Sequence, residues 1–302
     1  METRPLGRSD LRVSAIGLGC VTLGREIDRD TSFAVLDRAR EHGITLFDTA
    51  EAYSQGTSES ILGEWITARR NRDQIVLATK VSGTLTRQRI TDSAAASLVR
   101  LQTDRIDLFQ LHSWDDETPL EETLSALESL VRAGKVRAIG VSNWSALQLC
   151  RALLSAAVRA GIRIESIQPP YNLVQREIEP ELLPLCVEHQ IGITSYSPLG
   201  AGFLTGKYTS PTDVPKGTRF DVIPGHQPIY FTDAGFRVVN ALRALSAESG
   251  RTMMDLALAW VLSRPGVTSM LIGARSPAQV DQAVRAHSTP LPPDLLQQLN
   301  ML

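Results

Sequence analysis

Four ionisable side chains stand at or just beyond the ends of short apolar runs in the first half of the chain. Three of them directly follow such runs and the fourth lies in a following loop: Asp48, Lys80, His112 and Tyr53. Together they offer a carboxylate, an ammonium, an imidazole and a phenol, which are groups that enzymes use to move protons. If the runs are neighbouring parallel strands, their carboxyl ends meet at one face and the four groups share one site.

The combination favours proton transfer to a carbonyl oxygen. A lysine ammonium near a tyrosine hydroxyl favours the phenolate, so we expect Lys80 to lower the pKa of Tyr53 below its ordinary value of about 10. Asp48 would hold that lysine charged and oriented. His112 can donate a hydrogen bond that positions the substrate oxygen. Such a set suits reversible addition of hydride to a carbonyl, because the oxygen needs a proton as negative charge develops on it.

Each residue taken singly has a structural alternative. Asp48 and Lys80 can form an ion pair at the strand ends. Tyr53 can be a loop aromatic that packs its ring, and His112 can be a hydrogen-bonded structural histidine. Their joint placement at successive strand ends favours the catalytic interpretation.

Eight apolar runs alternate with segments of helical period along the chain. The runs have the length and composition of buried strands: 15–18, 44–47, 75–79, 106–111, 136–141, 166–168, 191–196 and 268–272. Such alternation predicts a (β/α)₈ barrel, in which right-handed crossovers place the helices outside the sheet. An open doubly wound sheet is the alternative. Its glycine fingerprint would have to be 17–22, where Thr22 replaces the third glycine.

Two segments give more detailed local predictions. The segment 118–134 carries an apolar stripe at helical spacing: Leu120, Leu124, Leu127 and Val131. We expect this helix to begin with a capping box, in which Thr118 is the N-cap and Glu121 the third residue, and to stop at Gly134. The segment 6–13 predicts a small β-hairpin that caps the floor of the barrel.

The bulk composition excludes several classes of function. The chain has 302 residues with 31 basic and 33 acidic side chains, so its formal net charge of −2 does not favour nucleic acid or a membrane surface. No apolar run approaches the roughly 18 residues of a membrane span, and the N-terminus lacks the apolar core of a signal peptide. We therefore expect a single barrel domain over 1–302, located in the cytoplasm, with neither nucleic-acid nor membrane partners.

A metal site is the main alternative chemistry for a barrel and needs clustered histidine and carboxylate ligands. The chain has five histidines, of which only His112 follows an expected strand. His42, His189 and His287 fall near expected helix ends, and the fifth lies in a long loop. The three cysteines show neither a pairing motif nor metal spacing, so we expect no metal.

Several motifs follow one another in the order found in a known family. They are the segments 47–53 (FDTAEAY), 111–112 (LH), 140–143 (GVSN), 168–172 (QPPYN), 196–199 (YSPL) and 202–208 (GFLTGKY). In these motifs the chain resembles the aldo-keto reductases over nearly its whole length. The resemblance implies a (β/α)₈ barrel that binds a nicotinamide dinucleotide without a Rossmann domain. NADPH is the expected cofactor, with NADH as a further possibility.

The resemblance assigns roles to the residues at the strand ends. Tyr53 is similar to the general acid, and Lys80 and Asp48 are similar to the residues that tune it. His112 is similar to the residue that orients the carbonyl. Trp114, just after His112, is expected to line the carbonyl pocket, with packing in a loop as its alternative role.

Four further residues resemble those around the nicotinamide. Ser142, Asn143 and Gln168 match the residues that hold the carboxamide, whose donors and acceptors suit hydroxyl and amide side chains. Tyr196 matches the aromatic residue that stacks on the nicotinamide ring, with a core aromatic at a strand end as its alternative. The resemblance also implies cofactor contacts at two residues near this end: Gly19 and Asp48.

The longest irregular stretch, 197–232, follows the seventh expected strand and so lies over the active face. Six of its residues match a belt that folds over the pyrophosphate: Ser197, Pro198, Leu199, Gly202, Lys207 and Arg219. Near the start of the last expected helix, four residues resemble the site for the adenosine end: Gly273, Arg275, Gln279 and Gln282. Arg275 is expected to pair with the extra phosphate of NADP. Ordinary solvated cations are the alternative roles of Lys207 and Arg275.

The chain departs from the family pattern in two places. Gln282 and Ala283 stand where the family often has an acidic residue and an asparagine that contacts adenine, so the asparagine contact is absent. Cys20 stands where the family commonly has threonine near the nicotinamide ribose. Neither departure touches the proton-transfer set.

Three activities remain open. The first is reduction of an aldehyde or ketone by NADPH, with Tyr53 as general acid. The second is NAD(P)-dependent oxidation of a sugar or sterol hydroxyl. The third is a nucleotide-sensing regulatory subunit with little turnover, as in relatives attached to membrane channels. The intact set of Tyr53, Lys80 and His112 favours the first, with a small carbonyl substrate. We expect a monomer or a weak homo-oligomer.

Overall fold

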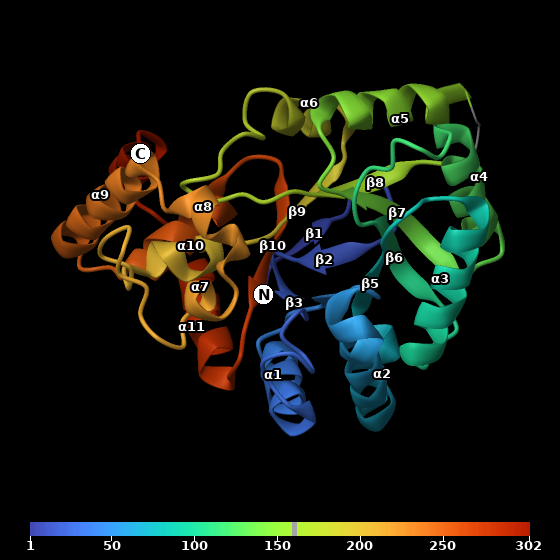
Figure 1. The fold of residues 1–302 in the computed structure, drawn as a ribbon, viewed down its shortest axis with the longest axis horizontal. Helices are drawn as coiled ribbons and strands as arrows, with labels where there is room; N and C mark the ends of the chain where they lie inside the picture. The colour runs from blue at the N-terminus through green and yellow to red at the C-terminus, as the bar shows by residue number, and fades with distance from the viewer. Residues whose placement is uncertain (159–161) are drawn as a thin grey trace.

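The computed structural model describes residues 1–158 and 162–302, and in that part of the chain eight parallel strands close into a barrel (Figure 1). The strands run in sequence order around the barrel, and β10 pairs with β3 to close it. They are β3 (Ile16–Gly19), β4 (Leu46–Asp48), β5 (Val76–Val81), β6 (Ile106–Leu111), β7 (Val136–Ser142), β8 (Ile164–Gln168), β9 (Gly192–Ser195) and β10 (Val267–Gly273). Each expected run overlaps one of these strands, so the predicted (β/α)₈ barrel is confirmed and the open sheet is wrong.

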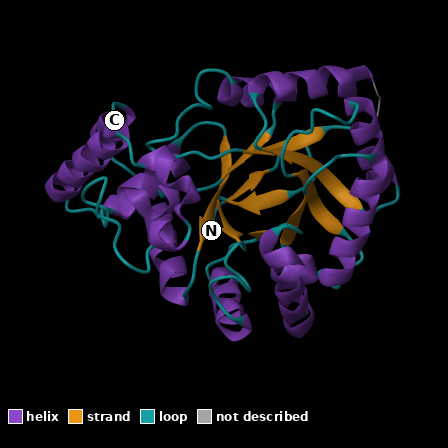
Figure 2. Ribbon diagram, viewed as in Figure 1, coloured by secondary structure: helices purple, strands orange, loops and turns teal. Residues whose placement is uncertain are grey.

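Helices surround the strands, as the purple and orange ribbons of Figure 2 show. The α-helices are α1 (Arg29–Glu41), α2 (Thr57–Arg69), α3 (Arg87–Arg100), α4 (Leu120–Arg132), α5 (Ala146–Val158), α6 (Leu182–His189), α7 (Arg219–Val222), α8 (Gln227–Tyr230), α9 (Asp233–Ser249), α10 (Met253–Ser263), α11 (Pro277–Ser288) and α12 (Pro293–Asn300). Short 3-10 turns are η1 (Tyr53–Gly56), η2 (Arg72–Gln74), η3 (Gly200–Thr205) and η4 (Pro224–His226). Within the described ranges, no helix has the combination of length and apolar character needed to cross a membrane.

An antiparallel hairpin closes the floor of the barrel, as expected. Its strands are β1 (Thr3–Pro5) and β2 (Arg12–Ser14), drawn in dark blue in Figure 1. Buried hairpin residues pack against side chains from five barrel strands: Leu6, Leu11 and Val13 against Leu46, Val76, Ala78, Leu108, Ala138 and Leu271. Gly192 has to be small here, because a Cβ atom would lie 2.9 Å from Leu6 Cδ1. The hairpin therefore fills the lower barrel and leaves the carboxyl ends of the strands for the site.

The start of α4 differs from the prediction by one residue. The helix begins at Leu120, and the N-cap position is occupied by Pro119, which makes no capping bond through its side chain. Pro119 is extended, with ψ at 126°, so Thr118 lies one residue too early to cap and the predicted capping box is wrong. The end is confirmed, because Gly134 takes a left-handed conformation with φ at 67° just after the helix.

The segment 197–232 is less irregular than predicted. It contains η3, α7, η4 and α8, and its aromatic rings form one cluster with the first turn of α9: Phe203, Tyr208, Phe220, Tyr230, Phe231 and Phe236. Helices of four residues are too short to display a helical period in the sequence. The packed rings give this segment, which we call the belt, a fixed position beside the barrel.

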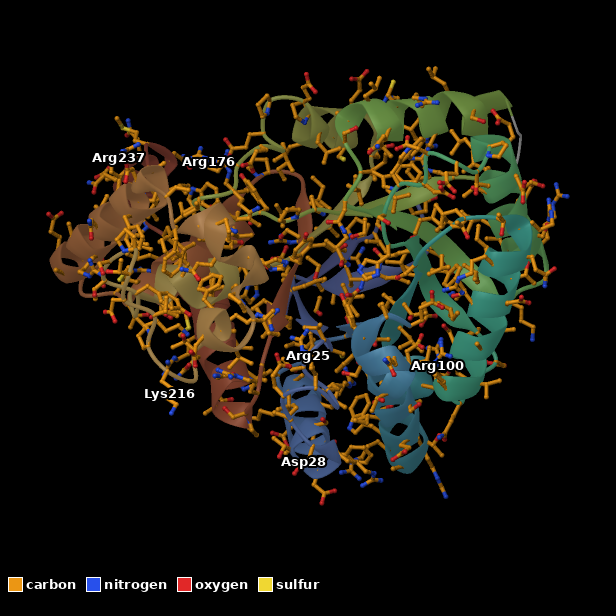
Figure 3. The ribbon with its side chains drawn as sticks, viewed as in Figure 1. Arg25, Asp28, Arg100, Arg176, Lys216 and Arg237 are labelled. Carbon is orange, nitrogen blue, oxygen red and sulfur yellow. The ribbon has the colours of Figure 1, made fainter. Side chains whose placement is uncertain are left out.

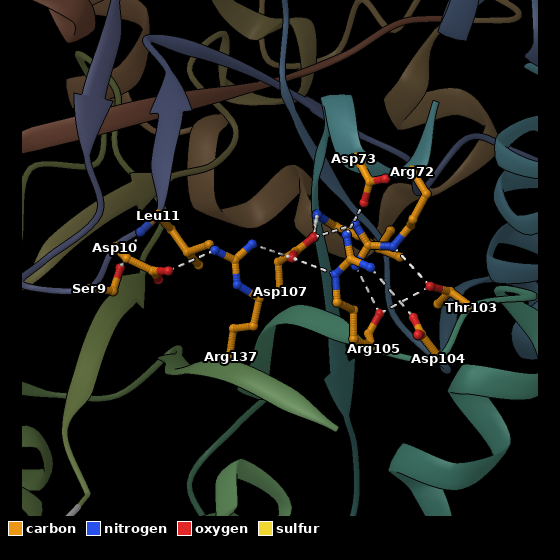
Figure 4. A network of polar contacts seen from close by, with 11 residues as sticks. Ser9, Asp10, Leu11, Arg72, Asp73, Thr103, Asp104, Arg105, Asp107 and Arg137 are labelled. Atoms are coloured by element: carbon orange, nitrogen blue, oxygen red, sulfur yellow. Dashed lines mark hydrogen bonds and ion pairs between the residues drawn. The ribbon is translucent and has the colours of Figure 1, made fainter. Parts of the chain in front are cut away.

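Near the start of β6, the buried carboxylate of Asp107 ties several elements together at the floor (Figure 4). It accepts hydrogen bonds from Arg72 at 2.7 Å, from Arg137 at 2.9 Å and from the backbone N–H of Leu77 at 2.8 Å. Arg137 also reaches Asp10 of the hairpin at 2.9 Å. The network joins β5, β6, β7 and the hairpin at the end of the barrel opposite the candidate site.

Candidate active site

The four predicted residues lie together at the carboxyl ends of neighbouring strands. Asp48 ends β4, Lys80 lies near the end of β5, His112 follows β6, and Tyr53 begins η1. Lys80 Nζ is 2.5 Å from Asp48 Oδ1 and 3.3 Å from the Tyr53 hydroxyl. The rings of Tyr53 and His112 meet edge to face with centroids 5.8 Å apart. The prediction that these groups are neighbours is confirmed.

Lys80 is fully buried, and the carboxylate of Asp48 beside it compensates its positive charge. Besides Asp48, its ammonium donates to the backbone oxygen of Thr49 at 2.9 Å. Burial alone lowers the pKa of Lys80, but the carboxylate of Asp48 and the neighbouring Tyr53 outweigh it, so the pKa is raised above its ordinary value. The ammonium is therefore charged in the folded protein at neutral pH.

The second oxygen of Asp48 is held by two glutamines. Gln110 Nε2 and Gln168 Nε2 each donate to Asp48 Oδ2 at 2.9 Å. The amide nitrogen of Gln168 thus lies against Asp48, and the predicted contact of Gln168 with a carboxamide stays a prediction. Gln110 was not predicted at all. The available signal was the period of two in a strand, which places Gln110 on the same side of β6 as His112.

The predicted direction of the Tyr53 pKa is wrong. Enclosure of the phenol raises its pKa above the ordinary value, Lys80 pulls the pKa down, and Asp48 raises it again. The sequence reasoning overlooked the burial of the phenol, which is the largest cause of the shift, and the carboxylate of Asp48, which opposes the effect of Lys80. Tyr53 is consequently protonated at neutral pH and suited to donate a proton.

His112 is neutral and held from several sides. Its Nδ1 lies 2.9 Å from the hydroxyl of Ser82, which the sequence analysis missed, and its backbone oxygen accepts from Asn143 Nδ2 at 2.9 Å. Burial, with help from the nearby charge of Lys80, lowers the pKa of His112 to about 4. The imidazole is therefore uncharged at neutral pH and can donate one hydrogen bond.

The residues predicted around the nicotinamide form a chain of hydrogen bonds beside this group. Asn143, left-handed with φ at 59°, accepts at Oδ1 from the Tyr196 hydroxyl at 2.8 Å. The Ser142 hydroxyl donates to the backbone oxygen of Gln168 at 2.9 Å. These contacts join the carboxyl ends of β7, β8 and β9 to His112 and bring the predicted residues to one side of the barrel mouth.

The belt folds through a series of left-handed residues: Ser197, Gly200, Ala201 and Gly202. A Cβ atom at Gly202 would lie 2.9 Å from Lys207 Nζ, so the glycine lets the ammonium approach the backbone. Pro198 is buried and Leu199 packs partly against the core.

Burial and the positive charge of Arg275 both lower the pKa of Lys207. Arg219 is likewise affected by burial and Arg275, so three predicted cations lie near one another.

The segment around β10 and α11 forms the far side of this cationic group. Gly273 ends β10 and pairs with Gly19 of β3, which pairs in turn with Asp48. The backbone N–H of Arg275 donates to Gln279 Oε1 at 2.7 Å, while the Arg275 side chain is exposed. Gln282 is half-buried on α11. A further helix, α12, follows, so the prediction that α11 is the last helix is wrong.

Trp114 packs in a lateral loop. Its ring meets Trp144 at 4.7 Å, lies 5.3 Å from the guanidinium of Arg151, and donates from Nε1 to Asp116 at 2.6 Å. It borders a cavity of about 440 Å³ between this loop and α5, and neither Tyr53 nor His112 lines that cavity. These contacts agree with the alternative role of Trp114, packing within a loop. Its role in lining the carbonyl pocket stays a prediction.

The comparison with known proteins decides the family. The sequence profile of the Aldo/keto reductase family matches residues 15–302. The aldo-keto reductase YhdN of Bacillus subtilis (strain 168) is 38% identical over 299 residues, covering 93% of this chain and 87% of the relative. The chain belongs to the aldo/keto reductase family.

Other relatives of this aldo/keto reductase carry different names. The uncharacterized oxidoreductase YrpG of Bacillus subtilis (strain 168) is 35% identical over 321 residues, covering 99% of this chain and 95% of the relative. A probable voltage-gated potassium channel subunit beta of Arabidopsis thaliana is 35% identical over 303 residues, covering 95% of this chain and 91% of the relative. The chain is therefore an oxidoreductase by family, and the names of these relatives do not identify a substrate.

The donor groups of this aldo/keto reductase fit a dinucleotide with several phosphates. Among the described residues, Lys207 and Arg275 have no carboxylate partner, and Arg219 shares Glu26, at 3.0 Å, with Arg25. Arg25, labelled in Figure 3, lies in the loop between β3 and α1. The belt also holds the buried hydroxyl of Tyr208, which has no hydrogen-bond partner in the described part of the chain. Uncompensated cations and a spare donor suit an anionic ligand. By contrast, the described residues contain no cluster of three metal-ligating side chains.

Proposed function

We propose that this aldo/keto reductase reduces a small aldehyde or ketone with NADPH, and that Tyr53 is the general acid. The observation that carries the proposal is the Tyr53 hydroxyl, protonated at neutral pH and 3.3 Å from the charged Lys80 ammonium. When bound, NADPH supplies a hydride to the carbonyl carbon and is oxidised to NADP⁺. The carbonyl π electrons move to oxygen, which takes the proton of Tyr53, so an alcohol and a phenolate result.

Lys80 and Asp48 act on the phenolate that this step leaves behind. The ammonium can donate to the phenolate oxygen from its present position, and negative charge there makes that hydrogen bond stronger. Asp48 keeps Lys80 charged without itself reaching the phenol. The pair therefore assists the product side of the proton transfer more than the starting state, as a catalytic interaction has to do.

His112 holds the substrate oxygen in this proposal. A neutral imidazole offers one N–H to the carbonyl, and its edge-to-face contact with Tyr53 keeps the two side chains side by side. An imidazolium is disfavoured here because the ring is largely buried and a second positive charge would lie near Lys80, and both effects lower the pKa of His112. The proposal therefore needs a single proton donor, Tyr53, and a single neutral hydrogen-bond donor.

For the cofactor, we propose that Ser142, Asn143 and Gln168 hold the nicotinamide carboxamide and that Tyr196 stacks on its ring, with Gly19 and Asp48 nearby. The belt residues Ser197, Pro198, Leu199, Gly202, Lys207 and Arg219 would enclose the pyrophosphate. Gly273, Arg275, Gln279 and Gln282 would hold the adenosine end. The guanidinium of Arg275 is exposed and has no carboxylate partner among the described residues, which supports NADPH over NADH because it can pair with the additional phosphate.

We further propose that residues 1–302 act as one unit, as a monomer or weak homo-oligomer in the cytoplasm. The free thiols of Cys20, Cys150 and Cys186 support a reducing compartment. A second candidate function is a cofactor-binding regulatory subunit with little turnover, which is favoured by the similarity to a probable potassium channel subunit beta. Oxidation of a sugar or sterol hydroxyl is the reverse of the same chemistry.

The test is a spectrophotometric assay of NADPH and NADH consumption across a panel of aldehydes, ketones and aldoses. Tyr53→Phe should abolish reduction and retain cofactor binding, measured by quenching of tryptophan fluorescence. Tyr171→Phe is the matched control, because Tyr171 bonds Glu179 away from the site. Turnover that survives in Tyr53→Phe would remove Tyr53 as the acid. Cofactor binding without turnover in the wild type would favour the regulatory subunit.

A further inference from the structure

The imidazole of His112 can present either a proton or a lone pair to a substrate, and its tautomer decides which. Because its pKa lies near 4, the ring carries a single N–H at neutral pH. A carbonyl oxygen only accepts hydrogen bonds. The useful tautomer therefore has its proton on the nitrogen that faces the substrate.

One neighbour can set that tautomer. Nδ1 of His112 lies 2.9 Å from the hydroxyl of Ser82, and within the described residues this is the only side-chain hydrogen bond of either group. The charged or titratable groups around the imidazole are Asp48, Glu51, Tyr53 and Lys80. None of these four forms a hydrogen bond with Nδ1. Nδ1 is thus occupied from the side of β5, and Nε2 is left for the substrate.

We propose that Ser82 is a positioning residue for carbonyl reduction: its hydroxyl donates to Nδ1 of His112 and keeps the imidazole proton on Nε2. This inference rests on the proposed function, since it concerns how His112 binds the substrate oxygen. A serine hydroxyl can also accept a hydrogen bond, which would place the proton on Nδ1. That arrangement would leave the hydroxyl proton without an acceptor in the described residues and would turn a lone pair toward the carbonyl oxygen.

Ser82 is itself held in place by Glu51. Its backbone N–H donates to Glu51 Oε1 at 2.8 Å. The other carboxylate oxygen of Glu51 accepts from the Ser93 hydroxyl at 2.7 Å, and the guanidinium of Arg89 also binds this carboxylate. With two partners on α3, Glu51 is fixed, and it fixes the backbone that carries Ser82.

The placement of Glu51 links Tyr53, the proposed proton donor, to His112, the proposed hydrogen-bond donor. It lies between Asp48 and Tyr53 in the chain, and its backbone N–H donates to the backbone oxygen of Lys80 at 3.2 Å. One short segment therefore carries the acid and, through Ser82, orients the imidazole. Ser82 does not touch the reacting atoms in this account, so its effect has to pass through His112.

The first experiment compares wild type with Ser82→Ala, Ser82→Thr and Ser93→Ala. Two-bond proton–nitrogen NMR correlations of the histidine rings, assigned with His112→Ala, report which ring nitrogen carries the proton. We expect the Nε2–H form in the wild type, a mixture of tautomers in Ser82→Ala, and restoration by Ser82→Thr, which returns a hydroxyl. Ser93→Ala removes a hydroxyl from the same network without touching His112 and should keep the wild-type tautomer. A wild-type ring with its proton on Nδ1, or an unchanged ring in Ser82→Ala, would overturn the proposal.

The second experiment measures steady-state reduction by the same variants. Losing one hydrogen bond to an uncharged group should lower kcat of Ser82→Ala by about tenfold, with a smaller change in KM. In the His112→Ala background the same serine substitution should cost nothing more, because its effect passes through the imidazole. An equal loss in both backgrounds would contradict the proposal and leave Ser82 with a purely structural role.

The two experiments separate this inference from the function on which it rests. If the wild type reduces none of the carbonyls offered, the proposed function fails in that panel while the ring spectra still decide whether Ser82 sets the tautomer. If the wild type turns over and the spectra of wild type and Ser82→Ala agree, the function stands and the positioning role of Ser82 is refuted.

Discussion

The buried pair of Asp48 and Lys80 gives the sharpest prediction about stability. Lys80 is 0% exposed and Asp48 2% exposed, so solvent does not screen the pair. Removing one member of a buried ion pair typically costs about 3–5 kcal/mol, because the remaining charge is left uncompensated. The two single substitutions should nevertheless differ, because their remaining partners differ.

Asp48→Asn should be the more costly change. It leaves a buried ammonium with the Thr49 backbone oxygen and the Tyr53 hydroxyl, which are both uncharged. Lys80→Met leaves a carboxylate that still accepts from two glutamine amides. We expect Asp48→Asn near the upper end of the range, about 5 kcal/mol, and Lys80→Met near the lower end, about 3 kcal/mol. The double variant should lose clearly less than the sum.

The assay is equilibrium unfolding in urea, followed by circular dichroism, for wild type, both single variants and the double variant. Glu128→Gln is the control, since it breaks the pair with Arg132, whose side chain is 74% exposed, and should cost at most about 0.5 kcal/mol. The pKa of Lys80 is raised by folding, so the stabilisation should be fully present below its unfolded pKa of about 10.4 and lost as pH rises through the higher folded value.

Three results would each refute part of this reasoning. A loss within about 1 kcal/mol for Asp48→Asn would mean that the ammonium is not left uncompensated in the barrel. Strictly additive losses in the double variant would mean that the two groups do not interact across their short contact. The reverse order of the single variants would show that the glutamine amides do not support the carboxylate.

Three further predictions concern the cofactor, the imidazole and the floor. Arg275→Ala should raise the Kd of NADPH by about tenfold and leave the Kd of NADH nearly unchanged, which fluorescence titration with both cofactors can check. An equal rise of both Kd values would exclude a role of Arg275 in recognising the additional phosphate. The pKa of His112 is about 4 in the folded protein, below its unfolded value of about 6.5, so the protein should lose stability as pH falls from about 6.5 toward 4. His112→Gln should remove this part of the pH dependence, as measured by urea unfolding. Asp107→Ala should lower the free energy of unfolding by about 3–5 kcal/mol in the same assay, because the Asp107 carboxylate is buried. Asp104→Ala is the control and should change the stability little, because the Asp104 side chain is 82% exposed. Similar losses for both variants would refute the idea that burial of Asp107 decides the cost.

Much of this fold could be predicted because the relevant signals are local. Apolar runs of strand length alternate with helical stripes, and each of the eight runs overlaps one strand of the barrel. Asp48, Lys80 and His112 could be placed together because parallel strands bring their carboxyl ends to one face whatever the details of packing. Tyr53 could be placed beside them because it lies in the loop that directly follows Asp48, and the family motifs then agreed with that placement.

The residues that sequence reasoning missed depend on contacts between strands. Gln110 and Ser82 are ordinary polar residues in the sequence, and only the register of β4, β5 and β6 brings one to Asp48 and the other to His112. The sign of the Tyr53 pKa shift failed for a related reason. It is set by the balance of burial against two opposite charges at short range, and spacing along the chain does not reveal that balance.

The three cations beside the belt also have a kinetic consequence. In a chain of net charge −2, Lys207, Arg219 and Arg275 make a local region of positive potential. Such a region accelerates encounter with an anionic dinucleotide, and added salt weakens that attraction once charges lie more than about 10 Å apart at 0.1 M ionic strength. An uncharged carbonyl compound feels no such attraction. Under the proposed function, salt should therefore slow binding of the dinucleotide and leave binding of the carbonyl compound almost unchanged. Varying the ionic strength then distinguishes the two binding steps.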